Sequence, residues 1–461
     1  MDATAIHDSR QGENTIRRAE SAMTYKDLRF DQGEGLNREG LADRIVNGEV
    51  FVFRGALQAF DCYEMLKEAS LRGIAKCAGQ DVADKAEKEG FHRIHEWIGA
   101  GDIPKLTDTV YDEVLPLADE FLRRFMTGAF PGVTSWYYEP QPNVRFHIPY
   151  DLAAAHRKTY DEFAKSHGQG KIVAHGPHRD SWLDCASNGL NLWFAMGRVR
   201  AGNGLTIYSL DNDGTFKFKR SGDIQDGEKL HKATTFDLEP GDVIMFHTDT
   251  LHGSELNRID ETRFVISCRL SVEKPEFPKL HYHPYVYSEW TKSPLLKPLA
   301  EVPSLTQFSY PKSLVIRTRN KFIPSMQPPE PEPNKIATVG EKIGGKFEVP
   351  LADVPVGEIK ALSGALCVAR LAEDRAVALS RRCPHAFGDL VNGWIDGNNV
   401  VCPWHNLPYD ADTGASPCKS LPKLKKVGCE IVGDKIVVDP SVTLNRASDD
   451  EILAEVEEAT A

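Results

Sequence analysis

The chain has 461 residues, of which 41% are hydrophobic and 26% are charged, and it is long enough for two or more globular domains. Its net charge of -12 argues against nucleic-acid or anionic-membrane partners, because both favour basic surfaces. We expect no membrane span and no secretory signal, since no apolar run approaches ~20 residues and the chain starts with polar residues. Nine scattered cysteines do not suit a disulfide framework, so we expect a cytoplasmic protein.

The first part of the chain mixes strand-like and helical patterns. We expect strands at residues 49–55 and 143–147, and helices at 60–72, 111–126 and 151–166. Pro116 fits its helix only near the first turn, because proline lacks a backbone N–H. Asp151 stands where a carboxylate can cap the next helix.

From residue 171 the pattern changes to short strands separated by turns. We expect strands at residues 171–174, 190–196, 205–210, 242–247 and 263–271. Short strands after a helical part favour a double-stranded β-helix, or jelly roll, which can hold a site between its sheets. The predicted fold class is therefore α+β to mainly β, with helices before a jelly roll.

A proline-rich, acidic stretch divides the chain. Residues 326–336 contain Q-P-P-E-P-E-P-N, which indicates a stiff, extended linker. We expect one domain over residues 1–325 and a small all-β domain over residues 337–440. Residues 441–461 are an acidic tail, in which Ser448 and Glu451 have the spacing of a capping box for a short helix.

The second domain contains two cysteines and two histidines at a distinctive spacing. The sequence C-P-H at residues 383–385 is followed, after sixteen residues, by C-P-W-H at residues 402–405. These are the ligands of a Rieske [2Fe-2S] cluster, with the thiolates on one iron and the imidazoles on the other. The predicted ligands are Cys383, His385, Cys402 and His405. Zinc motifs have different half-spacings, and neither half fits here.

The surroundings of these ligands resemble the Rieske ferredoxin domains. Shared features are the apolar strand at residues 376–380, the sequence G-D-L at 388–390, and Tyr409-Asp410 after the last ligand. Respiratory Rieske proteins have two further loop cysteines, whereas Gly388 and Trp404 stand in comparable positions here. The domain therefore resembles the ferredoxin and oxygenase type, which implies one-electron transfer and a flavoprotein reductase or ferredoxin as partner.

The first domain contains an H-x-D motif, His178-Arg179-Asp180, and a later histidine, His252. Two imidazoles and a carboxylate make up the facial triad that binds Fe(II) and leaves positions open for O2 and substrates. Arg263 lies eleven residues after His252. Its guanidinium suits a carboxylate ligand, because it can bond to it bidentately.

Over roughly residues 40–275, these motifs resemble the phytanoyl-CoA dioxygenase-like Fe(II)/2-oxoglutarate oxygenases. The resemblance implies that His178, Asp180 and His252 bind Fe(II), that Arg263 binds the C5 carboxylate of 2-oxoglutarate, and that O2 is the co-substrate. It also implies oxidation of a small molecule, in secondary metabolism. Because halogenases of this superfamily lack the carboxylate that Asp180 supplies, we expect hydroxylation, desaturation or a related C–H oxidation.

Several neighbouring side chains stay open as candidates. Arg269 lies on the same strand face as Arg263 and is the alternative 2-oxoglutarate ligand. The other candidates could also be ordinary core or packing residues: His175 and His247 beside the site, Asn191 and Trp193 on a strand that could face it, and Arg145 and His147 as ligands of an anionic group.

Two other functions stay open. A Rieske-type non-haem oxygenase would use NAD(P)H-derived electrons without 2-oxoglutarate, but that family places its Rieske domain first, and Ile244 stands where its iron motif needs an acid. A non-catalytic electron-transfer or iron-sensing protein is the second alternative. We expect the cluster to supply electrons to the mononuclear iron, within one chain or between the chains of a homo-oligomer.

Overall fold

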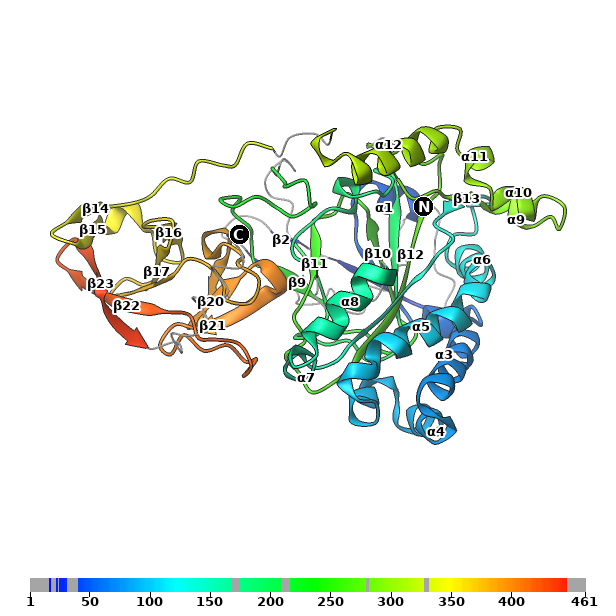
Figure 1. Ribbon diagram of the computed structural model, residues 1–461, viewed down its shortest axis with the longest axis horizontal. Helices are drawn as coiled ribbons and strands as arrows, with labels where there is room; N and C mark the ends of the chain where they lie inside the picture. The colour runs from blue at the N-terminus through cyan, green and yellow to red at the C-terminus, as the bar shows by residue number, and fades with distance from the viewer. Residues whose placement is uncertain are drawn as a thin grey trace, which may run out of the picture.

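A computed structural model describes residues 16–17, 22–23, 25–30, 40–167, 175–208, 216–278, 282–326 and 331–445. Figure 1 shows a jelly roll with its helices on the right and a small all-β domain on the left. The predicted fold class is confirmed. No described helix combines the length and apolar character that a membrane crossing requires.

The α-helices of the described residues all belong to the first domain. They are α1 (Leu41–Val46), α2 (Ala56–Ala59), α3 (Tyr63–Ala78), α4 (Gln80–Glu89), α5 (Ile103–Val114), α6 (Ala118–Ala129), α7 (Tyr150–Ala154), α8 (Arg157–His167), α9 (Ser288–Thr291), α10 (Lys297–Ala300), α11 (Pro303–Thr306) and α12 (Tyr310–Phe322).

The strands of the first domain are β1 (Ile16–Arg17), β2 (Ala22–Met23), β3 (Lys26–Arg29), β4 (Phe51–Arg54), β5 (Tyr137–Tyr138), β6 (Asn143–His147), β7 (Leu190–Ala195), β8 (Leu205–Ile207), β9 (Thr234–Thr235), β10 (Val243–His247), β11 (His252–Ser254), β12 (Arg263–Ser271) and β13 (Val286–Tyr287). Those of the second are β14 (Glu341–Ile343), β15 (Lys346–Pro350), β16 (Ile359–Ala361), β17 (Leu366–Ala372), β18 (Arg375–Ser380), β19 (Trp394–Asp396), β20 (Asn399–Cys402), β21 (Leu407–Asp410), β22 (Lys426–Val432) and β23 (Lys435–Asn445).

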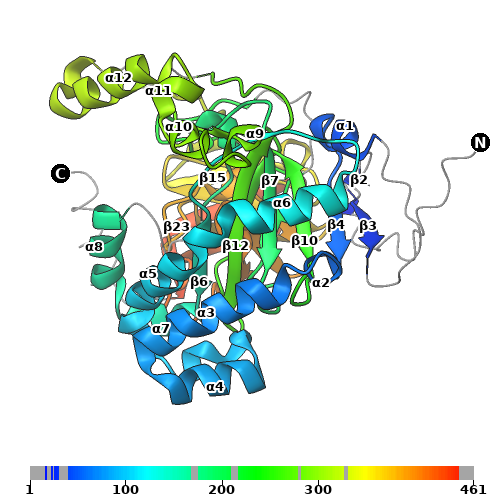
Figure 2. The ribbon, with the colours of Figure 1, turned by 90° about the vertical axis from the view of Figure 1, so that its right-hand side faces the viewer.

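Two sheets make up the jelly roll. The larger has the order β13-β5-β12-β7-β10-β4-β3, with β6 also paired to β12, and the smaller has the order β11-β8-β9. Because side chains alternate along a strand, Trp193, Ile244 and Val265 pack between the sheets, whereas Phe194 and Ile266 pack toward the helices. Helices α3, α5 and α6 cover that outer face of the larger sheet (Figure 2).

Most of the predicted strands are confirmed. The strands expected at 49–55, 143–147, 190–196, 242–247 and 263–271 are β4, β6, β7, β10 and β12, and the helix expected at 60–72 corresponds to α3. The strand expected at 205–210 is β8 at its start, and its last two residues lie outside the described residues. The strand expected at 171–174 and the helix expected in the acidic tail also lie outside them.

Two helix predictions are wrong in detail. The helix expected at 111–126 is divided between α5 and α6 by a 3-10 turn, Leu115–Leu117, because Pro116 cannot donate a helical hydrogen bond. The helix expected at 151–166 is likewise divided into α7 and α8, and Pro149 holds the N-cap position of α7. The Asp151 carboxylate instead accepts hydrogen bonds from the backbone N–H groups of Lys419 and Ser420, at 3.0 and 2.9 Å.

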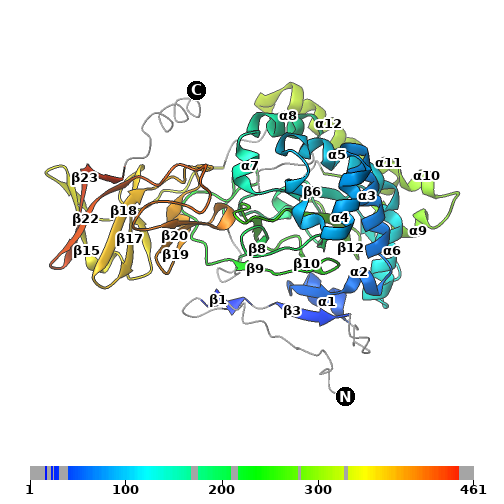
Figure 3. The same ribbon diagram turned by 90° about the horizontal axis from the view of Figure 1, so that it is seen from below.

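The second domain consists of a seven-stranded sheet, in the order β14-β15-β23-β22-β18-β17-β16, and a three-stranded sheet, β19-β20-β21. The three-stranded sheet lies nearer the jelly roll, and β14, β15, β22 and β23 lie farther from it (Figures 1 and 3). All nine cysteines are free thiols.

Candidate metal centres

The three residues of the predicted iron site lie together. Ligand atoms of His178, Asp180 and His252 are all within 4.8 Å of one another, and all three side chains are buried. The backbone brings them together, because the N–H of each histidine donates to the carbonyl of the other at 2.9 Å. This bridge places the H-x-D segment beside the start of β11.

Both histidines are oriented as metal ligands. The Nδ1 atom of His178 lies 2.8 Å from the Gly176 carbonyl, and the Nδ1 atom of His252 lies 2.9 Å from the Thr250 carbonyl. Because a carbonyl can only accept, each Nδ1 carries the proton and each Nε2 keeps its lone pair for a metal. Burial lowers the pKa of His252 to about 3, so its ring stays neutral. The three side chains therefore fit Fe(II).

The carboxylate of the triad is held by an arginine. The Nε atom of Arg269 lies 2.9 Å from Asp180 Oδ2 and its Nη2 lies 3.3 Å from Oδ1, while its Nη1 lies 3.1 Å from Glu139. Burial by itself would raise the pKa of Asp180, but the charge of Arg269 holds it well below its usual value. Asp180 is thus ionised, and Arg269 already has two carboxylate partners.

Arg263, unlike Arg269, forms no ion pair with a carboxylate of the described residues. Its side chain is 0% exposed, and its Nη1 donates to the carbonyls of Asn203 and Gly204 at 2.8 and 3.0 Å. Among the described residues, its Nε and Nη2 atoms have no hydrogen-bond partner. Its guanidinium lies over the Trp193 ring, which faces the space between the sheets. Because burying an unpaired cation is costly, this arrangement fits an anionic ligand such as 2-oxoglutarate.

Strand β6 places two further candidate residues, Arg145 and His147, beside β12 on the face that carries Arg263. His147 lies opposite Arg263 and Arg145 opposite Val265 in the pairing of β6 with β12. Arg145 is half-buried, and its guanidinium has no hydrogen bond or ion pair within the described part of the chain; its pKa is lowered to about 10, first by burial and then by Arg269. The buried Nε2 of His147 has no hydrogen-bond partner among the described residues either.

His147 should make stability depend on pH. Burial first, and the charge of Arg263 second, lower its pKa well below the ordinary value of 6.5. The unfolded chain therefore takes up a proton below about pH 6.5 that the folded chain does not, so the free energy of unfolding falls as the pH falls. His147→Gln should remove about 1 kcal/mol of that fall between about pH 7 and about pH 5.5, in urea unfolding of the metal-free protein. Identical slopes for the two proteins would contradict the prediction.

The other candidate histidines lie outside the metal-ligating group. The His175 ring centroid is 5.1 Å from that of His178. His247 is half-buried and accepts a hydrogen bond from the Asp249 N–H at 3.2 Å. The described residues thus bring His252 together with His178 and Asp180, and not with His247.

The predicted cluster ligands also lie together. Cys383, Cys402 and His405 are buried, and the rings of His385 and His405 are 4.8 Å apart. The Nδ1 atom of His385 is enclosed and has no hydrogen-bond partner among the described residues, as expected of an atom that binds iron. The Sγ atom of Cys383 lies 3.3 Å from the Tyr409 hydroxyl. Two thiols and two neighbouring imidazoles fit a Rieske cluster.

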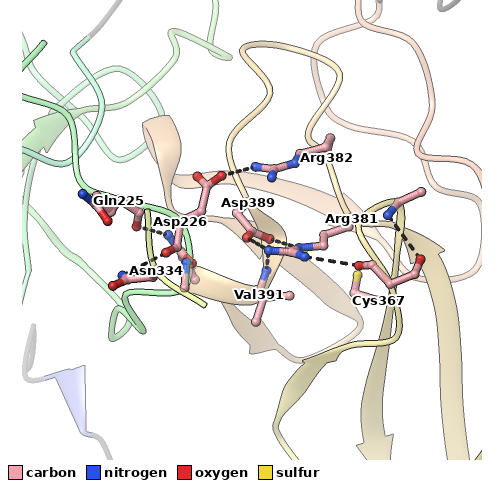
Figure 4. Close-up of polar contacts among 12 residues, drawn as sticks. Gln225, Asp226, Asn334, Cys367, Arg381, Arg382, Asp389 and Val391 are labelled. Carbon is pink, nitrogen blue, oxygen red and sulfur yellow. Dashed lines mark hydrogen bonds and ion pairs between the residues drawn. The ribbon is translucent and has the colours of Figure 1, made fainter. Parts of the chain in front are cut away.

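The loops around these ligands are tightly constrained. A Cβ atom on Gly388 would lie 2.7 Å from Trp404 Cγ and 3.1 Å from Cys402 Sγ, so only glycine lets the two loops meet. His405 itself has a φ of 72°, in the left-handed region that β-carbon-bearing residues rarely adopt. Arg381 and Asp389 form a buried, bidentate ion pair beside the first loop (Figure 4).

Comparisons with known proteins match two separate parts of the chain. Residues 143–265 match the model of the family "Phytanoyl-CoA dioxygenase (PhyH)", and residues 345–438 match that of the "Rieske [2Fe-2S] domain". The ferredoxin component of the naphthalene 1,2-dioxygenase system of Pseudomonas aeruginosa is 24% identical over 96 residues, which are 20% of this chain and 92% of that protein.

Solved structures resemble each part separately. The ferredoxin of Sphingomonas yanoikuyae B1 is 21% identical, with 23% of this chain and 98% of that chain covered and a TM-score of 0.18. The non-haem α-ketoglutarate-dependent epimerase SnoN from nogalamycin biosynthesis is 14% identical, with 50% of this chain and 82% of that chain covered and a TM-score of 0.28.

The fold and the two sites define a non-haem iron oxygenase that also carries an electron-transfer centre. This chain combines a region that matches the PhyH family model with a C-terminal region that matches the Rieske [2Fe-2S] domain model, and it is an oxidoreductase of the dioxygenase class. Fe(II), 2-oxoglutarate and a [2Fe-2S] cluster fit the residues present.

Proposed function

We propose that the protein is an Fe(II)/2-oxoglutarate-dependent oxygenase that hydroxylates, desaturates or otherwise oxidises a C–H bond of a small molecule of secondary metabolism. His178, Asp180 and His252 would hold Fe(II), which supplies Lewis-acid and O2-activating chemistry when bound. Arg263 would bind the C5 carboxylate of 2-oxoglutarate. The observation that carries the proposal is the buried guanidinium of Arg263, with two N–H groups that lack a partner among the described residues.

The neighbouring residues have distinct tasks in this proposal. Arg269 keeps Asp180 ionised and fixes its orientation, so that the carboxylate is ready to bind a cation. The Gly176 and Thr250 carbonyls keep each ligand histidine in the tautomer that presents Nε2. Trp193, Phe246 and Val265 form an apolar wall between the sheets, which excludes water from the reacting groups.

The same geometry favours a substrate with an anionic group. Arg145, Arg263 and Arg269 carry three positive charges on this face, and Asp180 and Glu139 carry two negative ones. With Fe(II) and the dianion of 2-oxoglutarate added, one positive charge remains. We propose that Arg145, whose guanidinium has no carboxylate of its own in the described chain, binds the anionic group of the substrate.

Cys383, His385, Cys402 and His405 would hold the Rieske cluster, which supplies single electrons. Since 2-oxoglutarate already provides two electrons per turnover, the role we assign to this domain is the return of oxidised iron to Fe(II) after an uncoupled turnover. A flavoprotein reductase or a ferredoxin would reduce the domain in turn. We place the division between the two domains in residues 326–336.

The decisive experiment is the conversion of 2-oxoglutarate to succinate and CO2 by the iron- and cluster-loaded protein. We expect slow, O2-dependent succinate release without substrate, and none from Asp180→Ala, which lacks the carboxylate ligand. If Fe(II)-loaded protein neither binds nor consumes 2-oxoglutarate, the proposal fails. Oxygen consumption with NADH and a reductase would then identify a Rieske-type oxygenase, and its absence an electron-transfer or iron-sensing protein.

A further inference from the structure

The loop that carries Cys402 and His405, two of the predicted cluster ligands, lies against the segments that carry the predicted iron ligands. Residues 403–406 of this loop contact the jelly roll beside β8 and β11, on the side where the three-stranded sheet of the Rieske domain approaches it (Figures 1 and 3). Three contacts join the loop to the neighbours of His178 and His252.

The first contact is made by Tyr208, which follows β8. Its ring is 0% exposed, and its hydroxyl donates to the Pro403 carbonyl at 2.5 Å. Its backbone N–H donates to the Leu251 carbonyl at 2.9 Å. Pro403 directly follows Cys402, and Leu251 directly precedes His252. Tyr208 therefore joins the residue next to a predicted cluster ligand to the residue next to a predicted iron ligand through two hydrogen bonds.

The second contact lies at the other end of β11. The Leu256 N–H donates to the His405 carbonyl at 3.1 Å, four residues after His252. The buried carboxylate of Glu255 accepts a hydrogen bond from Asn406 Nδ2 at 2.9 Å, and from the N–H groups of Gly202 and Gly204 at 2.6 and 3.1 Å. The strand that bears His252 is thus attached to the cluster loop at both ends.

The third contact is an aromatic one. A Cβ atom on Gly176 would lie 3.2 Å from Trp404 Cδ2, so the indole packs on the bare backbone of that glycine. The Gly176 carbonyl is also the partner of His178 Nδ1, at 2.8 Å. Trp404, which stands between Cys402 and His405 in the chain, therefore packs on the residue whose carbonyl contacts the predicted iron ligand His178.

A wider interface holds the two domains in this arrangement. Tyr208 and Leu251 share an apolar cluster with Trp394 and Val401 of the Rieske domain. Arg382 Nη1 donates to Asp226 Oδ2 at 2.8 Å (Figure 4), and Asn392 Nδ2 donates to the Gln225 carbonyl at 3.1 Å. The cluster loop is therefore seated on its own chain's jelly roll by apolar and polar contacts together.

From this geometry we propose that electrons pass within one chain, from the cluster to the iron site, through the contacts that Tyr208 and Trp404 make with the segments bearing His252 and His178. In each transfer the reduced cluster loses one electron, and one ferric ion at the mononuclear site gains it and becomes ferrous. The flavoprotein or ferredoxin reductant then restores the cluster. Bonded and hydrogen-bonded atoms couple two centres better than an open gap does, which favours this route. The inference rests on the proposed iron site but not on the use of 2-oxoglutarate.

The route can be tested by following the two metals separately. Protein with an oxidised cluster and Fe(III) is illuminated anaerobically with a deazaflavin that reduces the cluster, without 2-oxoglutarate. We expect the reduced-cluster signal to decay with first-order kinetics, at a rate independent of protein concentration, while the Fe(III) resonance disappears. A rate that rises with protein concentration would overturn the proposal. Because 2-oxoglutarate is absent, failure of the proposed co-substrate leaves this result unaffected.

Complementation separates transfer within a chain from transfer between chains of an oligomer. Cys383→Ser chains lack a cluster ligand, and chains with both His178→Ala and His252→Ala lack two of the three iron ligands, so neither can carry both metals. We expect the two variants, co-expressed and loaded, to show no transfer. Transfer at the wild-type rate in the mixed sample would show that the electron crosses between chains, and the within-chain route would be wrong.

Tyr208→Phe tests the contact itself. It keeps the ring but removes the hydroxyl that reaches Pro403, so we expect several-fold slower transfer and faster hydrogen exchange of the Leu256 N–H. The potential of the cluster and the affinity for Fe(II) should not change. Tyr282→Phe, which removes another buried and hydrogen-bonded hydroxyl far from the cluster loop, should leave the transfer rate at the wild-type value. Equal rates in Tyr208→Phe and wild-type protein would exclude this contact as part of the route.

Discussion

Arg263→Leu is expected to lower kcat/KM for 2-oxoglutarate by roughly 100- to 5,000-fold, because it removes one partner of a buried ion pair, at a cost of about 3–5 kcal/mol. The measurement is the initial rate of succinate release over a range of 2-oxoglutarate concentrations. The same substitution should not lower the free energy of unfolding in the absence of 2-oxoglutarate. The native guanidinium is fully buried with two N–H groups unpartnered among the described residues, so its removal also removes a desolvation cost.

A matched control separates this effect from the general loss of an arginine. Arg198 pairs with Glu261 at 2.6 Å and is partly exposed, so Arg198→Gln should change neither the kinetics nor the stability by much. If Arg263→Leu destabilises the protein and leaves the KM for 2-oxoglutarate unchanged, Arg263 is a structural residue. Arg269 would then have to be reconsidered as the anchor, in spite of its bonds to Asp180 and Glu139.

Cys383→Ser is expected to abolish the Rieske cluster, because serine replaces one of the two thiolates that hold one iron. With the cluster gone, iron oxidised in an uncoupled turnover stays oxidised. Succinate release should therefore stop after a few turnovers per iron when no ascorbate is added, and resume when ascorbate is supplied. The measurements are the visible absorption of the cluster and the total succinate formed per iron.

The control for this experiment is Cys429→Ser. Cys429 is a free, half-buried thiol on β22, in the same domain but outside the ligand set. This variant should keep the cluster and the full number of turnovers. If Cys383→Ser sustains many turnovers without ascorbate, the cluster does not serve to return the iron to Fe(II).

The candidate metal ligands could be proposed from the sequence because their chemistry is local. The H-x-D motif and the two cluster motifs place candidate ligands within a few residues of each other. Histidine, aspartate and cysteine side chains at these spacings are typical of metal sites and of few other structures. The alternation along residues 263–271 also placed Arg263 and Arg269 on one strand face, and the structure agrees. What could not be predicted is which arginine is already paired, because Asp180 lies 89 residues from Arg269 in the chain.

The partner of Asp151 is another feature that depends on residues far away in the chain and that the sequence did not predict. Asp151 has the residue type and position of an N-cap, but its carboxylate binds backbone N–H groups of Lys419 and Ser420. By local propensity alone, the Asp151 carboxylate could have capped the helix that follows it. The second domain packs against this segment and supplies the N–H groups that the carboxylate binds instead. The contacts that Tyr208 and Trp404 make with the other domain likewise had no sequence signal, since a buried aromatic residue looks like ordinary core.

The sequence by itself determined the fold class and predicted the two candidate ligand sets, since strand alternation and the spacing of histidines, cysteines and an aspartate are properties of short segments. The tertiary structure alone decided the relation between the two sites. Whether a cluster loop is seated beside His252 depends on contacts between residues about 150 to 195 positions apart, such as Leu256 with His405 and Tyr208 with Pro403. Such contacts depend on the packing of two whole domains, which no local pattern specifies.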